Sequence, residues 1–268
     1  MNQHLFDRAT TLDTVAPGRY AGRTDPAWAN MVGPFGGVTA ATALKAILLH
    51  ANRLGEPVAF TVNFCSALAD GDFEVEAQAV RTNRSTQHWA VSIEQSGETV
   101  LTATALTATR RETWGAQELR APQVLSPAGL GKPQMAAPVE WVKRYDLRFA
   151  EGPIPRVWDG EGDNSRTTVW VRDEPPRPLD FASLTALCDV FYPRVWRRRA
   201  TRVPAGTVSM TVYFHAGSDE LDAVGDGWLV GQAESSAFRN GYFDQRAQVW
   251  SQAGDLLATT HQVVYYKE

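Results

Sequence analysis

Three polar side chains, far apart in the sequence, stand in apolar surroundings where their types could do chemistry. Asp189 lies within LTALCDVFY, Gln262 within TTHQVVYY, and Thr207 opens the run TVSMTVYF. Burying an ionised carboxylate is costly unless it is hydrogen-bonded. A sequence that keeps Asp189 among leucine and phenylalanine therefore indicates either hydrogen-bond partners for it or a use for it in acid–base chemistry.

Each of the three also has an ordinary explanation. Asp189 could face solvent near the end of a helix. Thr207 could be one of the many threonines that strands favour. Strand alternation puts His261 and Gln262 on opposite faces, so one of the two must point inward. The positions of the three side chains in the fold decide between these ordinary explanations and a chemical role.

The chain repeats one order of elements twice, and these elements must position the three side chains. Each copy has an apolar helix followed by four segments with the period-two alternation of strands. The first copy is predicted to form a helix over 38–52 and strands over 57–64, 73–80, 89–95 and 100–109. The second is predicted to form a helix over 181–192, capped by Asp180 and stopped by Pro193, and strands over 207–214, 227–235, 243–252 and 256–266. A helix that is apolar nearly all round must be buried, and a curled sheet is the available partner.

The polar positions occur in the second copy only. Phe64 aligns with Phe214 at an offset of 150, and Gly97 aligns with Gly254 at an offset of 157. With these offsets, and with 146 for the helices, the counterparts of Asp189, Thr207 and Gln262 are Ala43, Pro57 and Ala105. This asymmetry favours one site, in the second copy.

A proline-rich stretch separates the copies. Residues 121–141 carry prolines at 122, 127, 133 and 138, which a central strand would not tolerate. We expect an extended linker there, dividing the chain into 1–120 and 142–268. A second irregular stretch, 151–165, is predicted to be a loop between the first strands of the second copy; it could be a lid, but a plain connection is favoured.

Four short motifs follow one another in the order found in a known family. They are FGG at 35–37, LCDVFYP at 187–193, TVSMTVYFH at 207–215 and ATTHQVV at 258–264. With the order of elements, they resemble the acyl-CoA thioesterase II (TesB-like) double hot-dog family over nearly the whole chain, apart from the linker and 151–165. The resemblance implies an α+β double hot-dog fold, with two antiparallel sheets each wrapped around a central apolar helix.

The same resemblance implies roles for the three side chains. Asp189 would be the general base for a water molecule that attacks a thioester carbonyl. Gln262 and Thr207 would hold that water in place. The substrate would be acyl-CoA, with no covalent intermediate, metal or other cofactor. The Gly36-Gly37 pair could bring backbone N–H groups to the thioester oxygen, or could simply form the turn into the helix.

Two other functions stay open. One is a non-catalytic module that binds acyl-CoA or lipid. The other is an enoyl-CoA hydratase-like hot-dog enzyme, although its pattern pairs an aspartate with a histidine and Asp189 has no histidine within five residues. The sequence has no HExxH spacing, GxSxG elbow, Walker motif or Rossmann fingerprint, which argues against metal, α/β-hydrolase, P-loop and dinucleotide chemistry.

Composition sets the remaining expectations. The 268 residues are 44% hydrophobic and 21% charged, typical of a globular protein, and the net charge of −4 gives no general attraction to nucleic acid or an acidic membrane. Apolar runs are too short to span a bilayer, and two cysteines are too few for a disulfide framework, so a cytoplasmic location is expected. Open strand edges allow a homo-oligomer. An arginine run over 194–202 could hold coenzyme A phosphates, or be a solvated helix end.

Overall fold

Strands make up more of the chain than helices do, and the helices are short apart from one. The computed structural model describes residues 3–132 and 139–268. The helices are α1 (Leu5–Ala9), α2 (Gly36–Leu49), α3 (Phe181–Leu187), α4 (Arg194–Arg199) and α5 (Ser218–Val224), with 3-10 turns at Pro26–Trp28, Pro127–Gly129 and Trp141–Arg144. The strands are β1 (Asp13–Ala16), β2 (Arg19–Arg23), β3 (Glu56–Phe64), β4 (Asp72–Thr82), β5 (Thr86–Gln95), β6 (Glu98–Ala108), β7 (Tyr145–Glu151), β8 (Thr167–Asp173), β9 (Ala205–Phe214), β10 (Leu229–Glu234), β11 (Phe238–Arg239), β12 (Tyr242–Ser251) and β13 (Leu256–Tyr266).

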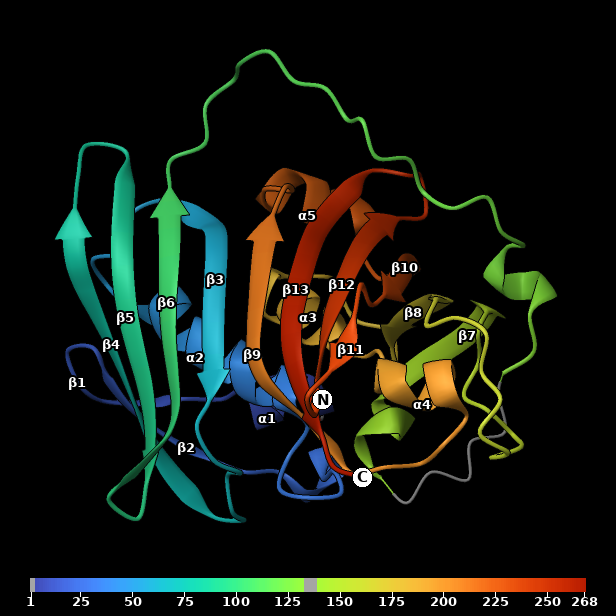
Figure 1. Ribbon diagram of the computed structural model, residues 1–268. Coiled ribbons are helices and arrows are strands. Elements are labelled where there is room, and N and C mark those ends of the chain that lie inside the picture. Colours follow the sequence, from blue (N-terminus) through green and yellow to red (C-terminus); the bar gives the residue numbers. More distant parts are fainter. Residues whose placement is uncertain (1–2, 133–138) are drawn as a thin grey trace.

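Two copies of one strand order meet edge to edge. From the outer edge inward, the N-terminal half runs β1-β2-β4-β5-β6-β3 and the C-terminal half runs β7-β8-β10-β12-β13-β9. All of these pairings are antiparallel, and β3 pairs with β9 at the junction, as Figure 1 shows at the centre of the sheet. Thr61 lies opposite Thr211, its repeat counterpart, and their hydroxyls are 2.9 Å apart. A pseudo-twofold axis therefore passes between these two threonines.

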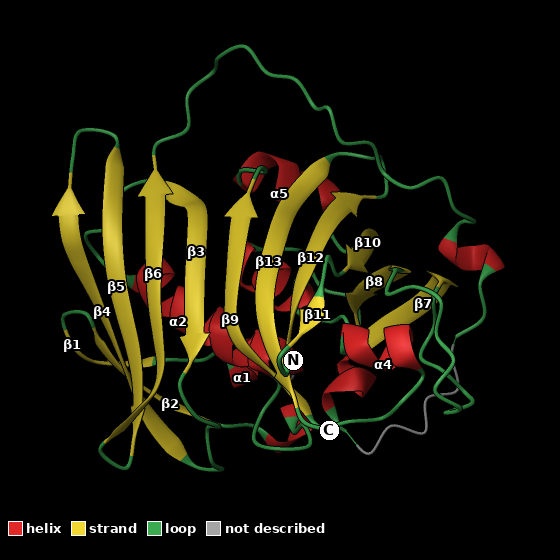
Figure 2. Ribbon diagram, viewed as in Figure 1, coloured by secondary structure: helices red, strands yellow, loops and turns green. Residues whose placement is uncertain are grey.

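The sheet curls around α2 and α3, which lie on one side of it (Figure 2). Ten of the fourteen residues of α2 are buried, as its largely apolar sequence requires. Thr39 and Thr42 are compatible with that burial because each hydroxyl donates to a carbonyl one turn back, at 3.3 and 2.9 Å. The two helices pack against each other, so a single apolar core spans both halves. The double hot-dog prediction is confirmed, and the two sheets are continuous through β3 and β9.

The second helix is shorter than predicted. It ends at Leu187 rather than continuing to residue 192, so Asp189 lies in the turn beyond it. The Asp189 N–H bonds to the Ala186 carbonyl at 3.0 Å, a tightened last turn. Pro193 lacks the backbone N–H that a continuing helix would need. Because the chain leaves the helix before Phe191, the Phe191 ring can pack against β10, where Gly231 leaves room for it.

The described part of the linker covers the outer side of the C-terminal half. Ala121, Val124 and Leu130 pack against a cluster built on Trp170 and Trp250. The Trp170 indole also donates to the carbonyl of Leu125 at 2.8 Å. Residues 133–138 of the predicted linker lie outside the described residues, and the predicted domain boundaries stay a prediction.

The segment 151–165 connects β7 to β8, where the sequence placed a connection. Of the helices in residues 3–132 and 139–268, none combines the length and apolar character that crossing a lipid bilayer requires.

Candidate active site

The structure brings Asp189, Gln262 and Thr207 into one hydrogen-bonded chain. The Thr207 hydroxyl donates to Oε1 of Gln262 at 3.2 Å, and Nε2 of Gln262 donates to Oδ1 of Asp189 at 3.0 Å. An ionised carboxylate can only accept, so the NH2 end of the carboxamide faces Asp189 and its oxygen is left to accept from Thr207. Three side chains separated by up to 73 residues along the chain thus form a single polar group.

Each side chain is positioned by a different element. Gln262 lies in β13 and is only 2% exposed, while its neighbour His261 points outward, which settles the choice left by strand alternation. Thr207 lies near the start of β9, directly beside β13. Asp189 reaches both from the turn after α3 and is partly buried.

The N-terminal half contributes backbone to the same place. The Gly37 N–H, in the first turn of α2, lies near the Asp189 carboxylate and favours its charged form. A β-carbon at Gly36 would lie 3.0 Å from Oδ2 of Asp189, and one at Gly37 would lie 2.7 Å from the Ala186 carbonyl oxygen. Two glycines are therefore needed here for close approach. The sequence did not predict Gly36 and Gly37 as part of the catalytic set. Two consecutive glycines at the start of a helix were the signal that another segment approaches the backbone closely there.

The surroundings make Asp189 a base suited to neutral pH. Burial raises the pKa of its carboxyl to about 7, against the opposing effect of the hydrogen bonds from Gln262 and Gly37, which favour the charged form. A carboxylate with this pKa accepts a proton more readily than an ordinary aspartate.

The corresponding place in the N-terminal half is apolar. Ala43 and Ala105 are buried there, and Pro57 stands in β3 where Thr207 stands in β9. The structure therefore supports one polar cluster, located between the halves, with its side chains from the C-terminal half.

Other reactive residues lie apart from this cluster or lack partners for chemistry. Burial raises the pKa of the Cys188 thiol, which disfavours a thiolate. No histidine of the described residues hydrogen-bonds to Asp189, so the Asp–His pair of a hydratase is not formed. Within the same residues, no group of three or more histidine, cysteine and acidic side chains converges as a metal site would require.

The arginine run does not form one patch. Arg194 is fully buried and donates to the Ser165 carbonyl and the Thr167 hydroxyl. Arg197 pairs with Asp163, and Arg202 stacks over Trp158. The solvated-helix-end interpretation is thus wrong for Arg194, whose guanidinium ties α4 to the start of β8.

Family comparison agrees with the architecture. The family described as acyl-CoA thioesterase C-terminal domain matches residues 118–266, and the family described as acyl-CoA thioesterase N-terminal domain matches residues 24–108. Comparison with curated proteins gave no match.

Solved structures share the fold over the whole chain. A hot-dog-fold protein of unknown function from Alicyclobacillus acidocaldarius is 46% identical, with a TM-score of 0.94, covering 100% of this chain and 99% of that one. A thioesterase II from Thermobifida fusca, titled putative, is 19% identical, with a TM-score of 0.82 and coverage of 100% and 99%. An acyl-CoA thioesterase II, TesB2, from Mycobacterium marinum is 17% identical, with a TM-score of 0.77 and coverage of 98% of both chains. The last two similarities concern the fold alone.

Fold and family matches together define a double hot-dog enzyme of the thioesterase class. The chain belongs to the acyl-CoA thioesterase family.

Proposed function

We propose that the protein hydrolyses acyl-CoA thioesters to a free carboxylic acid and coenzyme A, using a water molecule activated by Asp189. The observation that carries the proposal is the hydrogen-bonded chain from Thr207 through Gln262 to Asp189, set in an apolar interior. Such a chain costs free energy to bury, and the N-terminal half folds without one.

The reaction needs one proton acceptor that later returns the proton. As the water oxygen bonds to the thioester carbon, a water proton passes to the Asp189 carboxylate. The C–S bond then breaks, and the leaving sulfur takes that proton to become the thiol of coenzyme A. The product acid keeps the water oxygen, and the carboxylate is regenerated.

Gln262 and Thr207 act by position. The carboxamide holds the Asp189 carboxylate in one orientation, and the threonine hydroxyl holds the carboxamide. The N-terminus of α2 faces the same place, and its positive end would stabilise negative charge that develops on the thioester oxygen.

The test is thiol release from a panel of acyl-CoA esters by Asp189→Asn. We expect a loss of about 1,000-fold in kcat, within the range that general bases contribute, with an unchanged circular dichroism spectrum. Asp173→Asn is the matched control, because Asp173 is also a buried carboxyl with a pKa raised, by burial, to about 6, but it bonds to Ser183 instead. Unchanged turnover in Asp189→Asn would refute the role of Asp189. Binding of acyl-CoA by the unsubstituted protein without release of thiol would support a binding module instead.

A further inference from the structure

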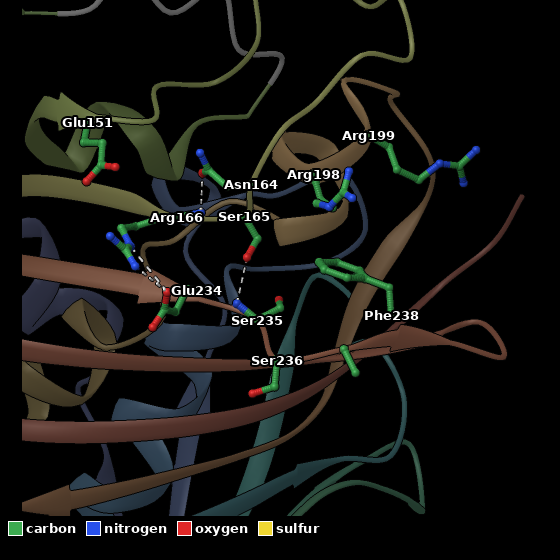
Figure 3. A pocket seen from close by; sticks show the side chains of 11 residues that line it. Glu151, Asn164, Ser165, Arg166, Arg198, Arg199, Glu234, Ser235, Ser236 and Phe238 are labelled. Carbon is green, nitrogen blue, oxygen red and sulfur yellow. Dashed lines mark hydrogen bonds and ion pairs between the residues drawn. The ribbon is translucent and has the colours of Figure 1, made fainter.

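A second hollow lies beside α4, outside the Asp189 cluster. It has a volume of about 710 Å³, within the usual range for small-molecule sites. Its walls are the connection from β7 to β8, the end of α4 and the segment after β10 that leads into β11 (Figure 3). Figure 3 shows Glu151 at one end, and Arg198 and Phe238 toward the other.

At one end of this hollow the Arg198 guanidinium is not paired with any carboxylate that the structure describes. Arg198 is exposed and donates to the Gly162 carbonyl at 2.7 Å, and no carboxylate of the described residues lies within ion-pair distance of it. Glu234 is held by two guanidiniums, those of Arg166 at 3.2 Å and Arg246 at 2.6 Å. Glu151, at the opposite end, offsets the excess charge of that cluster, so the guanidinium of Arg198 is the cation that an anion would meet.

Uncharged groups in the same walls suit a nucleotide. The Ser235 hydroxyl is buried and has no hydrogen-bond partner among the described residues. Phe238 presents a partly exposed ring, supported from behind by Phe243 at 5.3 Å between ring centres. A flat aromatic face beside a guanidinium is the combination that binds a base and its phosphates.

The hollow is a neighbour of the Asp189 cluster. Val264 pairs with Thr207 across the β9–β13 ladder. Val264 and Val195 of α4 belong to one apolar cluster, and Phe238 packs against that cluster. The apolar cluster that supports Phe238 of the hollow therefore includes the strand partner of Thr207.

We propose that this hollow binds the phosphorylated nucleotide end of coenzyme A, with Arg198 on the phosphates and Phe238 against the adenine. The proposal rests on the proposed function, because the thioester end of the same molecule would lie at Asp189. In coenzyme A the pantetheine arm separates thioester and nucleotide, so two neighbouring sites, one reactive and one basic, match its two ends.

The test compares ligands with and without the nucleotide. Binding of coenzyme A and of pantetheine is measured by calorimetry for the unsubstituted protein, Arg198→Glu and Arg198→Lys. Arg84→Glu makes the same charge change at an exposed position of the β4–β5 turn, far from the hollow, and serves as the control. The Michaelis constants for an acyl-CoA and the matching acyl-pantetheine are then measured for each protein.

We expect Arg198→Glu to weaken coenzyme A binding and to raise KM for acyl-CoA by about tenfold, the size expected for one charge-assisted contact. Values for pantetheine and acyl-pantetheine should not change, and Arg198→Lys should lie between. Three results would overturn the proposal: no binding of coenzyme A, equal binding by Arg198→Glu, or an equal loss for both ligands. If coenzyme A binds through Arg198 but no thioester is hydrolysed, the hollow stands and the proposed function fails.

Discussion

The two halves of the molecule share a strand order and differ in what they bury beside their helices. Where the C-terminal half has Asp189, Thr207 and Gln262, the N-terminal half has alanine, proline and alanine. Both halves nonetheless form equivalent sheets. The scaffold thus requires only apolar side chains at these positions, and the polar group is an addition that stability does not explain.

The halves also differ at the start of their helices. In α3 the N-cap Asp180 accepts from the Ser183 N–H at 2.7 Å, so that donor is used within the helix. In α2 the N-cap is Phe35, whose side chain cannot accept. The first turn of α2 has no side-chain cap, and its Gly37 N–H lies near the Asp189 carboxylate and favours its charged form. The N-terminal half therefore contributes backbone to the cluster, and the C-terminal half contributes the side chains.

The difference between the halves is tested first by converting Gln262 to its N-terminal counterpart, alanine. Gln262→Ala should lower kcat about 100-fold, because Asp189 and the water lose the group that orients them. Gln87→Ala is the control: Gln87 is a buried carboxamide of the N-terminal half, bonded to Leu54, Asn52 and Thr82. It should lower the melting temperature and leave kcat of the folded protein unchanged. Equal kcat losses in the two variants would remove the distinction between the halves.

The contribution of the N-terminal half is tested at Gly37. Gly37→Ala would put a methyl group against the Phe35 ring and the Ala186 carbonyl, forcing α2 away from Asp189. We expect kcat to fall between about 10- and 100-fold and stability to fall by about 1–3 kcal/mol. Gly115→Ala, at a glycine with open space around it, should change neither. Full activity in Gly37→Ala would mean that the C-terminal half suffices.

A smaller effect is expected at Thr207. Thr207→Val keeps the shape and removes the hydroxyl that orients Gln262, so kcat should fall about 5- to 10-fold, as for the loss of one hydrogen bond. Thr207→Ser should restore most of it. Thr211→Val, which removes a hydroxyl at the pseudo-twofold axis, should leave kcat as it is. An equal loss of activity in Thr211→Val would mean that the Thr207 hydroxyl affects kcat only through the structure of the sheet.

The smallest effect is on stability. The folded pKa of Asp189, about 7, lies above the ordinary value of 3.8, so the folded state binds the proton more tightly than the unfolded state. The stabilising effect of protonation is complete below pH 4 and is lost as pH rises through 7. Asp189→Asn should therefore melt several degrees higher than the unsubstituted protein at pH 8 and about equally at pH 4, by calorimetry. A lower melting temperature at pH 8 would show that the ionised carboxylate stabilises the fold.

Periodicity and repetition predicted much of this structure. The alternating segments predicted eight of the twelve strands that repeat between the halves, and gave no ranges for β1, β2, β7 and β8. Comparison of the copies drew attention to Asp189, Thr207 and Gln262 because their counterparts were apolar. Local periodicity predicts which face of an element is buried. Comparison of two repeat copies shows which buried polar residues the fold can do without, because the other copy has apolar residues at those positions.

What the sequence could not supply were contacts between distant segments. The pairing of β3 with β9 depends on two exposed edges meeting, and no local pattern encodes that. The Gly37 contact depends on where α3 ends, which was predicted five residues too late because the apolar run continues through Phe191. The cytoplasmic location and the homo-oligomer stay predictions.

The central claim is that the Asp189 carboxylate accepts the water proton. It is tested most directly by the pH dependence of kcat/KM for the unsubstituted protein and Asp189→Asn. Because a general base must be ionised, activity should rise with pH through an apparent pKa of about 7 and level off above it, and this rise should be absent from the residual rate of Asp189→Asn. The same rise in both proteins would contradict the account and assign the proton to another group.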